Sequence, residues 1–277
     1  MSKARTPGDA GRLALDAVAY AVVIFLLLPT IIVAPMSVSP EKYLQFPPQG
    51  FSLKWYAAYF ADRDWVAATL FSAEAGLIAA VGATVIGTMA AMALVRGRVR
   101  GRPLIELLVI GPVVVPHIAL AVAMFLVFEQ LRLTGTLLGF AMAHIVLALP
   151  FAIFTVLAAL YRFDADLEMA ALSCGAGRVR TFFHVTLPMI MPGVASAALF
   201  AFIISFDEAV VSFFISDLDR KTLPRKMFED IDFDVSPVLA AVATMLSLLT
   251  VAILVAGHVL KRAAERRAAA RPGEGAA

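Results

Sequence analysis

Apolar residues in this chain gather into runs much longer than those of an ordinary soluble helix. Six such runs follow one another, at residues 18–36, 66–95, 104–128, 135–160, 189–205 and 238–260. A helix needs about 20 mostly apolar residues to cross a hydrocarbon core of roughly 30 Å. The pattern therefore predicts an all-α, polytopic membrane protein with six transmembrane helices.

Composition supports the same class and excludes several others. The 277 residues are 61% hydrophobic and 16% charged, whereas soluble domains are about 45–50% apolar and about 25% charged. The single cysteine, Cys174, excludes a disulfide framework and a multi-cysteine metal site, and the four histidines lack a metal-ligand spacing. No glycine-rich phosphate loop appears, so we expect this chain itself to bind no nucleotide, metal or other cofactor.

The polar segments between the runs predict the orientation in the membrane. Basic residues concentrate at 1–13, in RGRVRGR at 96–102 and at 261–277, and cytoplasmic loops carry such an excess. Both termini are therefore predicted to be cytoplasmic. A nucleic-acid patch is the alternative interpretation of 96–102, which its place between two spans disfavours. A signal peptide is the alternative for the first run, but that run is long and lacks a clear cleavage site.

These boundaries divide the chain into four regions. They are a cytoplasmic tail (1–13), a first transmembrane helix with an outer interfacial segment (14–64), a membrane core (65–260) and a second cytoplasmic tail (261–277). The outer segment contains FSLKWYAAYF, whose aromatic residues suit the membrane–water boundary. The second run carries small residues that let neighbouring helices approach closely, namely Gly76, Ala80, Gly82, Ala83 and Gly87.

A less apolar stretch, DADLEMAALSCGAGRVRTFFHVTLPMIMP, separates the fourth run from the fifth. Asp164 or Asp166 can cap a helix there, and Gly175 is expected to break it, because glycine adopts turn conformations that other residues resist. A second short helical segment at 178–185 is predicted to stop at Leu187-Pro188. The stretch therefore predicts a helix, a sharp turn and a second helix on the cytoplasmic side.

The spacing of this stretch resembles the EAA loop of binding-protein-dependent ABC importer permeases. The matching positions are Met169, Ala170, Ala171, Gly175, Val185, Leu187 and Pro188. Met169 stands where the family pattern has glutamate, and Glu168 precedes it, so the resemblance makes Glu168 the candidate for the missing charge. It implies that the 164–187 loop couples the chain to a cytoplasmic ATPase. A plain helical hairpin without that role is the alternative.

A second resemblance is to the spermidine/putrescine permease subfamily. It rests on S-F-D-E at 205–208, T-L-P at 222–224, V-S-P at 235–237 and the earlier PPQGFSLKWY. It implies the type I importer permease fold, a place in the bacterial inner membrane, and the transport of a small cationic solute such as putrescine or spermidine. Another small solute is the alternative within this family.

The same resemblance implies the partners. We expect two cytoplasmic ATPase subunits, which use ATP and Mg²⁺, a second permease chain different from this one, a periplasmic solute-binding protein and membrane lipid, but no nucleic acid. The chain itself is then not an enzyme. An ion-gradient-driven secondary transporter is the rival, but we see no inverted repeat, and a non-transporting scaffold leaves the loop spacing unexplained.

Ionisable residues near or within the runs are candidates for the solute pathway. Asp207 and Glu208 follow the fifth run, where charge is costly unless it meets water or a partner; helix capping, or pairing with Arg225 or Lys226, is the alternative. Cation–π contacts with the solute are expected from Phe206, Phe213 and Phe214. Two further candidates lie inside runs. They are Glu74, which otherwise lies near the headgroups, and His117, which follows Pro112 and Pro116 and could instead bond within the bundle.

Overall fold

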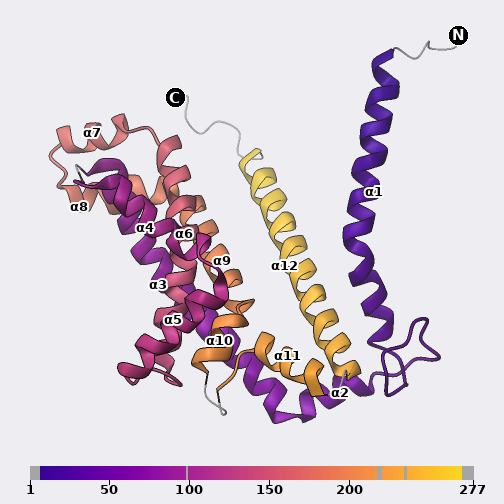
Figure 1. Cartoon of the computed structure of the whole chain (residues 1–277). Coiled ribbons are helices and arrows are strands. Elements are labelled where there is room, and N and C mark those ends of the chain that lie inside the picture. Colours follow the sequence, from indigo (N-terminus) through magenta and orange to yellow (C-terminus); the bar gives the residue numbers. More distant parts are fainter. Residues whose placement is uncertain (1–6, 98, 217–219, 234–235, 270–277) are drawn as a thin grey trace, which may run out of the picture. The chain divides into compact units, whose positions relative to one another are not determined.

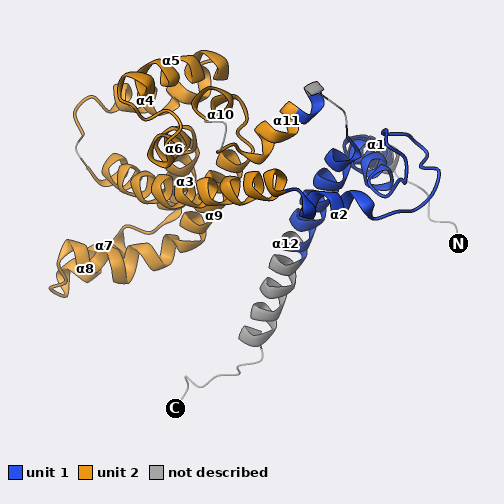
Figure 2. Cartoon of the chain, turned by 90° about the horizontal axis from the view of Figure 1, so that it is seen from below, with its two compact units in different colours: residues 1–62, 230–277 blue, residues 63–229 orange. Residues whose placement is uncertain are grey.

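The computed structural model describes residues 7–97, 99–216, 220–233 and 236–269. This part of the chain is helical and contains no strand, which confirms the all-α prediction. The ends of both predicted tails (1–6 and 270–277) and Val235 of the V-S-P motif lie outside the described residues. The chain divides into two compact units, residues 1–62 with 230–277 and residues 63–229 (Figure 2).

The second unit is built around three long helices, α3 (Arg63–Arg96), α6 (Leu137–Arg162) and α9 (Leu187–Phe206), which pack against one another (Figure 1). Their contact surfaces are rich in alanine and glycine, as the sequence predicted. A Cβ on Gly87 would lie 2.9 Å from the Ala152 Cβ, and one on Gly76 would lie 2.9 Å from the Phe202 ring. Small residues therefore let these helices approach closely.

The third apolar run is two helices rather than one kinked span. Helix α4 (Arg102–Val114) and helix α5 (His117–Gln130) meet at an angle of 105°. Pro116 directly precedes α5, and Val115 before it is extended (φ −69°, ψ 133°), because a residue before proline is pushed out of the helical region. Pro112 lies inside α4 without ending it. The third run thus contains a sharp corner, and His117 is the first helical residue after it.

The segment before α9 also differs from the expectation. Helix α7 (Asp166–Ser173) and the short helix α8 (Arg178–Thr181) are separated by a turn, as predicted. However, the second segment does not stop at Leu187-Pro188. It continues through a π-helical turn, η1 (Phe182–Thr186), directly into α9. Pro188 is the second residue of α9 and does not interrupt this continuous helical path.

Beyond α9 this unit continues with α10 (Val210–Ile215) and with α11 (Leu223–Phe233), which belongs to it as far as Glu229. Helix α10 packs against α5, and the Ser72 hydroxyl of α3 accepts a 2.7 Å hydrogen bond from the backbone N–H of Leu223. These helices lie at the end of the unit opposite to α7 and α8 (Figure 1).

The other unit contains α1 (Pro7–Met36), α2 (Lys54–Ala61) and α12 (Pro237–Ala269), with contacts from α12 to both α1 and α2. Helix α1 already begins at Pro7, inside the segment expected to be a tail, since proline suits a first helical turn. Between α1 and α2 the Trp55 indole N–H donates to the Ser39 carbonyl at 2.9 Å, and the Ser37 and Tyr56 hydroxyls lie 2.7 Å apart.

Four helices in the described part are long and apolar enough to cross a membrane, or five if the bent pair α4–α5 forms one span. In α12 the apolar helix found there runs from Pro237 to Ala252. The count of six spans and the cytoplasmic position of both termini therefore stay predictions. The apolar helices agree with the predicted class, a membrane-spanning protein.

Candidate coupling surface and solute pathway

The turn between α7 and α8 follows from the identity of residue 175. Gly175 has φ +84°, the left-handed conformation in which other residues are strained. The Ala176 N–H bonds to the Ala171 carbonyl and the Gly175 N–H to the Leu172 carbonyl, which is the Schellman arrangement at a helix C-terminus. At the other end of α7, an Asp164 carboxylate oxygen accepts from the Asp166 N–H at 3.0 Å. The glycine turn at the C-terminal end of α7 is thus as predicted, whereas its N-cap residue is Ala165, which has no side-chain cap.

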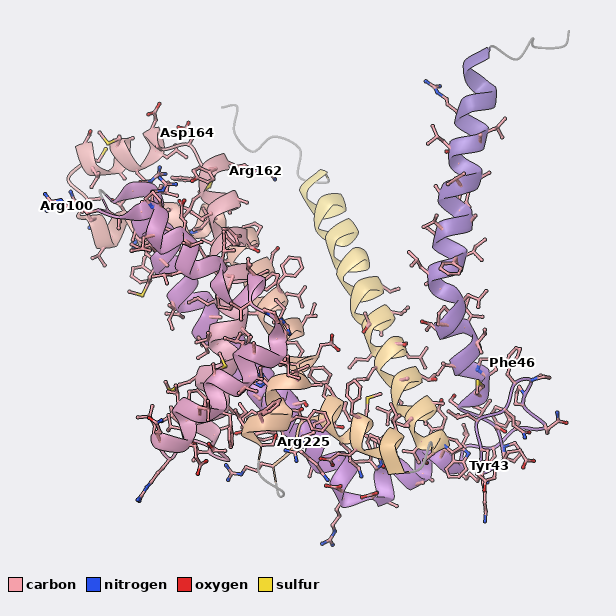
Figure 3. All side chains as sticks on the ribbon, viewed as in Figure 1. Tyr43, Phe46, Arg100, Arg162, Asp164 and Arg225 are labelled. Carbon is pink, nitrogen blue, oxygen red and sulfur yellow. The ribbon has the colours of Figure 1, made fainter. Side chains whose placement is uncertain are left out.

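An apolar surface is exposed on α7, α8 and η1. Met169 is 62% exposed, Val179 72% and Phe183 56%, with Leu167 and Leu172 also exposed. Exposed apolar residues that lie together indicate a site for a partner or for lipid. Arg100, Arg162 and Asp164 gather at this same end of the unit, whereas Arg225 lies at the opposite end (Figure 3).

The motif residues are not all on this surface. Met169 and Ala170 are exposed on α7, and Ala171 is half-buried. Val185 and Leu187 are half-buried in η1 and at the start of α9, with Pro188 exposed beside them. The first half of the motif therefore lies in α7 and the turn after it, while the second half lies in η1 and at the start of α9.

Glu168 faces the protein rather than an outside partner. Its side chain is 16% exposed, and one oxygen lies 3.0 Å from Nε of Arg96 at the end of α3. The other oxygen accepts from the Thr186 hydroxyl at 2.9 Å. Both oxygens of the carboxylate expected to face an ATPase are thus engaged within the chain.

At the opposite end, α9 ends at the acidic pair, as expected from the sequence. Asp207 follows α9 and is exposed, and within the described residues its side chain forms no hydrogen bond or ion pair. Glu208 is 6% exposed, and one of its oxygens accepts from the Val211 N–H at 2.9 Å. Glu208 therefore satisfies one N–H in the first turn of α10 from the residue before its N-cap, Ala209, although it does so buried and not in water as the capping alternative had it.

The second Glu208 oxygen lies 3.6 Å from Nδ1 of His117. His117 is 53% exposed and begins α5 at the 105° corner. The structure thus brings together two candidates that are distant in the sequence, at the point where the α4–α5 pair changes direction. The two cations that the sequence offered as partners of the acidic pair have carboxylates elsewhere: Arg225 pairs with Glu229 and Lys226 with Asp64.

The aromatic candidates have different surroundings. Phe206 is half-buried and stacks on Phe202 with ring centroids 5.6 Å apart. Phe213 already has a cation, since the Arg225 guanidinium lies 5.6 Å from its ring centroid, and Phe214 packs against a buried cluster around Phe140. Phe213 thus has an internal cation–π contact, and the expected contacts of these rings with a solute stay predictions.

Glu74 lines a pocket of about 240 Å³ together with Asp64, Arg220 and Lys221. This favours the cavity-lining interpretation of Glu74. Burial lowers the pKa of the Lys221 ammonium, but its hydrogen bonds with Asp64 and Glu229 outweigh this effect, and the pKa is raised overall. Lys221 is therefore charged at neutral pH and held 2.8 Å from the Asp64 carboxylate.

Sequence reasoning missed the partners of several candidates. Arg96 was treated only as part of a basic loop, and Thr186 only as a spacer in the motif, because both lie far from Glu168 along the chain. His144 is fully buried in α6 and bonds through Nδ1 to the Ser205 hydroxyl at 2.7 Å. The S-F-D-E motif was a possible signal, since Ser205 begins it. The described residues contain no cluster of metal-ligating side chains.

The family described as binding-protein-dependent transport system inner membrane component matches residues 83–265. The spermidine/putrescine transport system permease protein PotC of Haemophilus influenzae is 31% identical over 250 residues, covering 89% of this chain and 96% of that protein. The putrescine transport system permease protein PotI of Escherichia coli is 30% identical over 226 residues, covering 79% and 80%.

The fold is also found in solved structures. A bacterial ABC transporter involved in the import of the acidic polysaccharide alginate matches with a TM-score of 0.69 at 14% identity, covering 94% of this chain and 99% of that chain. A bacterial alginate ABC transporter in complex with an alginate pentasaccharide-bound periplasmic protein matches with the same TM-score at 16% identity.

Helical spans, a corner in the third run and a helix–turn–helix between the fourth and fifth thus define a membrane permease subunit. The chain belongs to the binding-protein-dependent transport system inner membrane component family. It is an ABC importer permease of the inner membrane, and ATP hydrolysis is carried out by separate ATPase subunits. These findings confirm the predicted class, location and non-enzymatic role, while the site residues stay predictions.

Proposed function

We propose that this permease passes a small polyamine, putrescine or spermidine, and that Asp207 is its first contact at the end of α9. The observation that carries the proposal is the exposed Asp207 carboxylate, which is unpaired within the described residues. Beside it, one oxygen of Glu208 bonds to the Val211 N–H and the other lies near His117. Relatives named for spermidine and putrescine transport support the choice of solute. An ammonium group meeting a carboxylate here gains a charge-assisted hydrogen bond.

The geometry divides the work between the two carboxylates. Asp207 is exposed directly after the last residue of α9, whereas Glu208 is buried and one of its oxygens accepts a hydrogen bond from the first turn of α10. Asp207 is thus the direct contact, and Glu208 contributes charge through its other oxygen near His117. Phe206 next to them offers a ring face, worth about 0.5–2 kcal/mol to a bound cation.

For coupling, we propose that the exposed apolar residues of α7 and α8 dock on an ATPase subunit. Two such subunits, a second and different permease chain and a periplasmic binding protein complete the importer. ATP-driven closure of the ATPases then moves the α7–α8 segment as a rigid body and opens the path alternately to each side.

The test is ATP-dependent uptake of labelled putrescine and spermidine by the reconstituted complex. We expect uptake that needs both ATP and the binding protein, and that falls when Asp207→Asn is introduced without loss of the ATPase subunits. Uptake of neither polyamine, with uptake of another solute, would overturn the solute assignment. Uptake driven by an ion gradient without ATP would favour a secondary transporter instead.

A further inference from the structure

Glu168 connects α7 to two of the long core helices. Its carboxylate lies 3.0 Å from Nε of Arg96, the last residue of α3. It also accepts from the hydroxyl of Thr186, which is buried in the π-helical turn that leads into α9. A single side chain of α7 is therefore bonded to the ends of α3 and α9.

The third core helix reaches the same point through an aromatic ring. Phe163 directly follows α6, and the Arg96 guanidinium lies 5.8 Å from its ring centroid. Helices α3, α6 and α9, which pack together along their length, thus converge on the Arg96–Glu168 pair. This group, Arg96, Phe163, Glu168 and Thr186, is called the latch below.

The latch differs from an ordinary surface ion pair at the same end of the unit. The side chains of Arg102 and Glu106 pair within α4 and are 46% and 41% exposed, whereas those of Arg96 and Glu168 are 30% and 16% exposed. Water screens the first pair more strongly. The Arg96–Glu168 pair also joins two different helices, so it restrains the position of one relative to the other, which a pair within a single helix does not do.

We propose that Glu168 is a positioning residue that transmits force, not the charge that docks the ATPase. It fixes α7 to the core, so that displacement of α7 and α8 moves α3, α6 and α9 instead of being absorbed at the Gly175 turn. The inference rests on the proposed coupling role of α7 and α8. It assigns Arg96 and Thr186 to the same task and leaves docking to the exposed apolar surface.

The experiment uses the complete reconstituted importer with labelled putrescine as the probe. Glu168→Gln keeps an oxygen that can accept from Thr186 and removes only the charge that faces Arg96. We expect this variant to retain its ATPase subunits and its ATP hydrolysis, while the ATP consumed per putrescine imported rises about fivefold or more, as expected for loss of a coupling interaction. Asp166→Asn removes an exposed carboxylate from the same helix and should leave this ratio unchanged.

Two further variants separate positioning from docking. Met169→Ala should lower the amount of ATPase recovered with the permease, with no change in the ratio for the complexes that remain. The single variants Arg96→Glu and Glu168→Arg should both raise the ATP consumed per putrescine imported. The double variant that exchanges the two residues should bring this ratio part of the way back to the wild-type value, since the threonine hydroxyl can also accept a hydrogen bond from arginine. If Glu168→Gln instead loses the ATPase subunits and keeps the ratio, Glu168 is the docking charge and the proposal is wrong.

A readout that needs no solute keeps this test apart from the solute assignment. Amide hydrogen exchange of residues 166–173 in the assembled complex should become faster in Glu168→Gln and Thr186→Val, because local opening is easier when a restraint is lost. Unchanged exchange in both variants would overturn the latch. If the wild-type complex imports neither polyamine, only the solute proposal fails, and the latch is judged on this exchange and on whether ATP hydrolysis still depends on the binding protein.

Discussion

The two ends of the second unit use carboxylates in opposite ways. At the α7 end, Glu168 has both oxygens bonded inside the chain, and the exposed side chains include Met169 and Val179. At the α10 end, Asp207 is exposed without an ion pair in the described residues, and Glu208 keeps one oxygen toward the exposed His117. An exposed apolar surface beside an inward-facing Glu168 suits a folded partner. An outward-facing carboxylate such as that of Asp207 suits a small cation.

The largest expected effect comes from the turn at the α7 end. Gly175→Ala adds a methyl group that meets nothing within 4 Å, so its cost arises from φ +84° alone. That strain is about 1–2 kcal/mol, or roughly a 5–30-fold loss in the population of the turn, and uptake should fall with recovery of the ATPase.

Gly177→Ala is the matched control for this turn, since the site is equally open but φ is −71°. Both variants are compared by ATPase co-purification and uptake at equal membrane levels. Equal behaviour of the two alanine variants would contradict a role for the left-handed turn.

A slightly smaller effect is expected at the other end. Asp207→Asn removes the exposed charge, and an exposed ion pair contributes about 0.2–1 kcal/mol. The apparent KM for putrescine should therefore rise by up to about fivefold, while ATPase recovery stays normal. Asp166→Asn at the α7 end removes the same charge and should leave KM unchanged; a matching rise there would show a general charge effect rather than a local contact.

Glu208 allows the cap and the charge to be separated. Glu208→Ala removes the acceptor for the Val211 N–H, and losing such a cap costs about 0.5–2 kcal/mol. We expect a lower Tm for the purified permease in detergent. Glu208→Gln keeps an amide oxygen at this position and should retain most of the Tm while still weakening uptake. If Glu208→Gln lowers the Tm as much as Glu208→Ala does, the carboxylate charge rather than the hydrogen bond to Val211 stabilises α10.

The smallest effect is expected from Glu106→Gln. This residue pairs with Arg102 at 2.7 Å on an exposed face of α4, and exposed pairs of this spacing contribute about 0.3–0.5 kcal/mol. Neither Tm nor uptake should change measurably. A large loss of coupling in this variant would mean that any ion pair at this end matters, and would remove the distinction drawn for the Arg96–Glu168 pair.

The sequence could predict what depends on local pattern. The apolar lengths located α3 and α6 closely, and Gly175 marked a turn that its positive φ now explains. Pro116 marked a break, but proline fixes where a helix is interrupted and not the angle, so the 105° corner was not foreseen. The interpretation of Glu168 as a docking charge was not supported by its surroundings, because its partners are supplied by tertiary packing.

The same limit applies to the α10 end. Arg225 was considered as a partner for the acidic pair, yet it bonds to Glu229 one helical turn away and faces the Phe213 ring. Short-range helical spacing could have suggested Arg225 with Glu229. No local pattern could have brought His117 to Glu208, because that contact depends on the packing of α5 against α10.

The π-helical turn η1 makes the spacing of the loop motif a matter of phase. Each residue advances an α-helix by about 100°, and a π-turn accommodates one residue more than an α-turn. Deleting a single residue between Phe182 and Thr186 would therefore remove the bulge and keep α8 and α9 close to their present phase, because the π-turn absorbs the additional residue. Deleting a residue from the first turn of α9, where no bulge absorbs it, would instead turn the Val179 side chain relative to α9 by about 100°. Single-residue deletions should accordingly be tolerated better within η1 than in the helical turns that flank it.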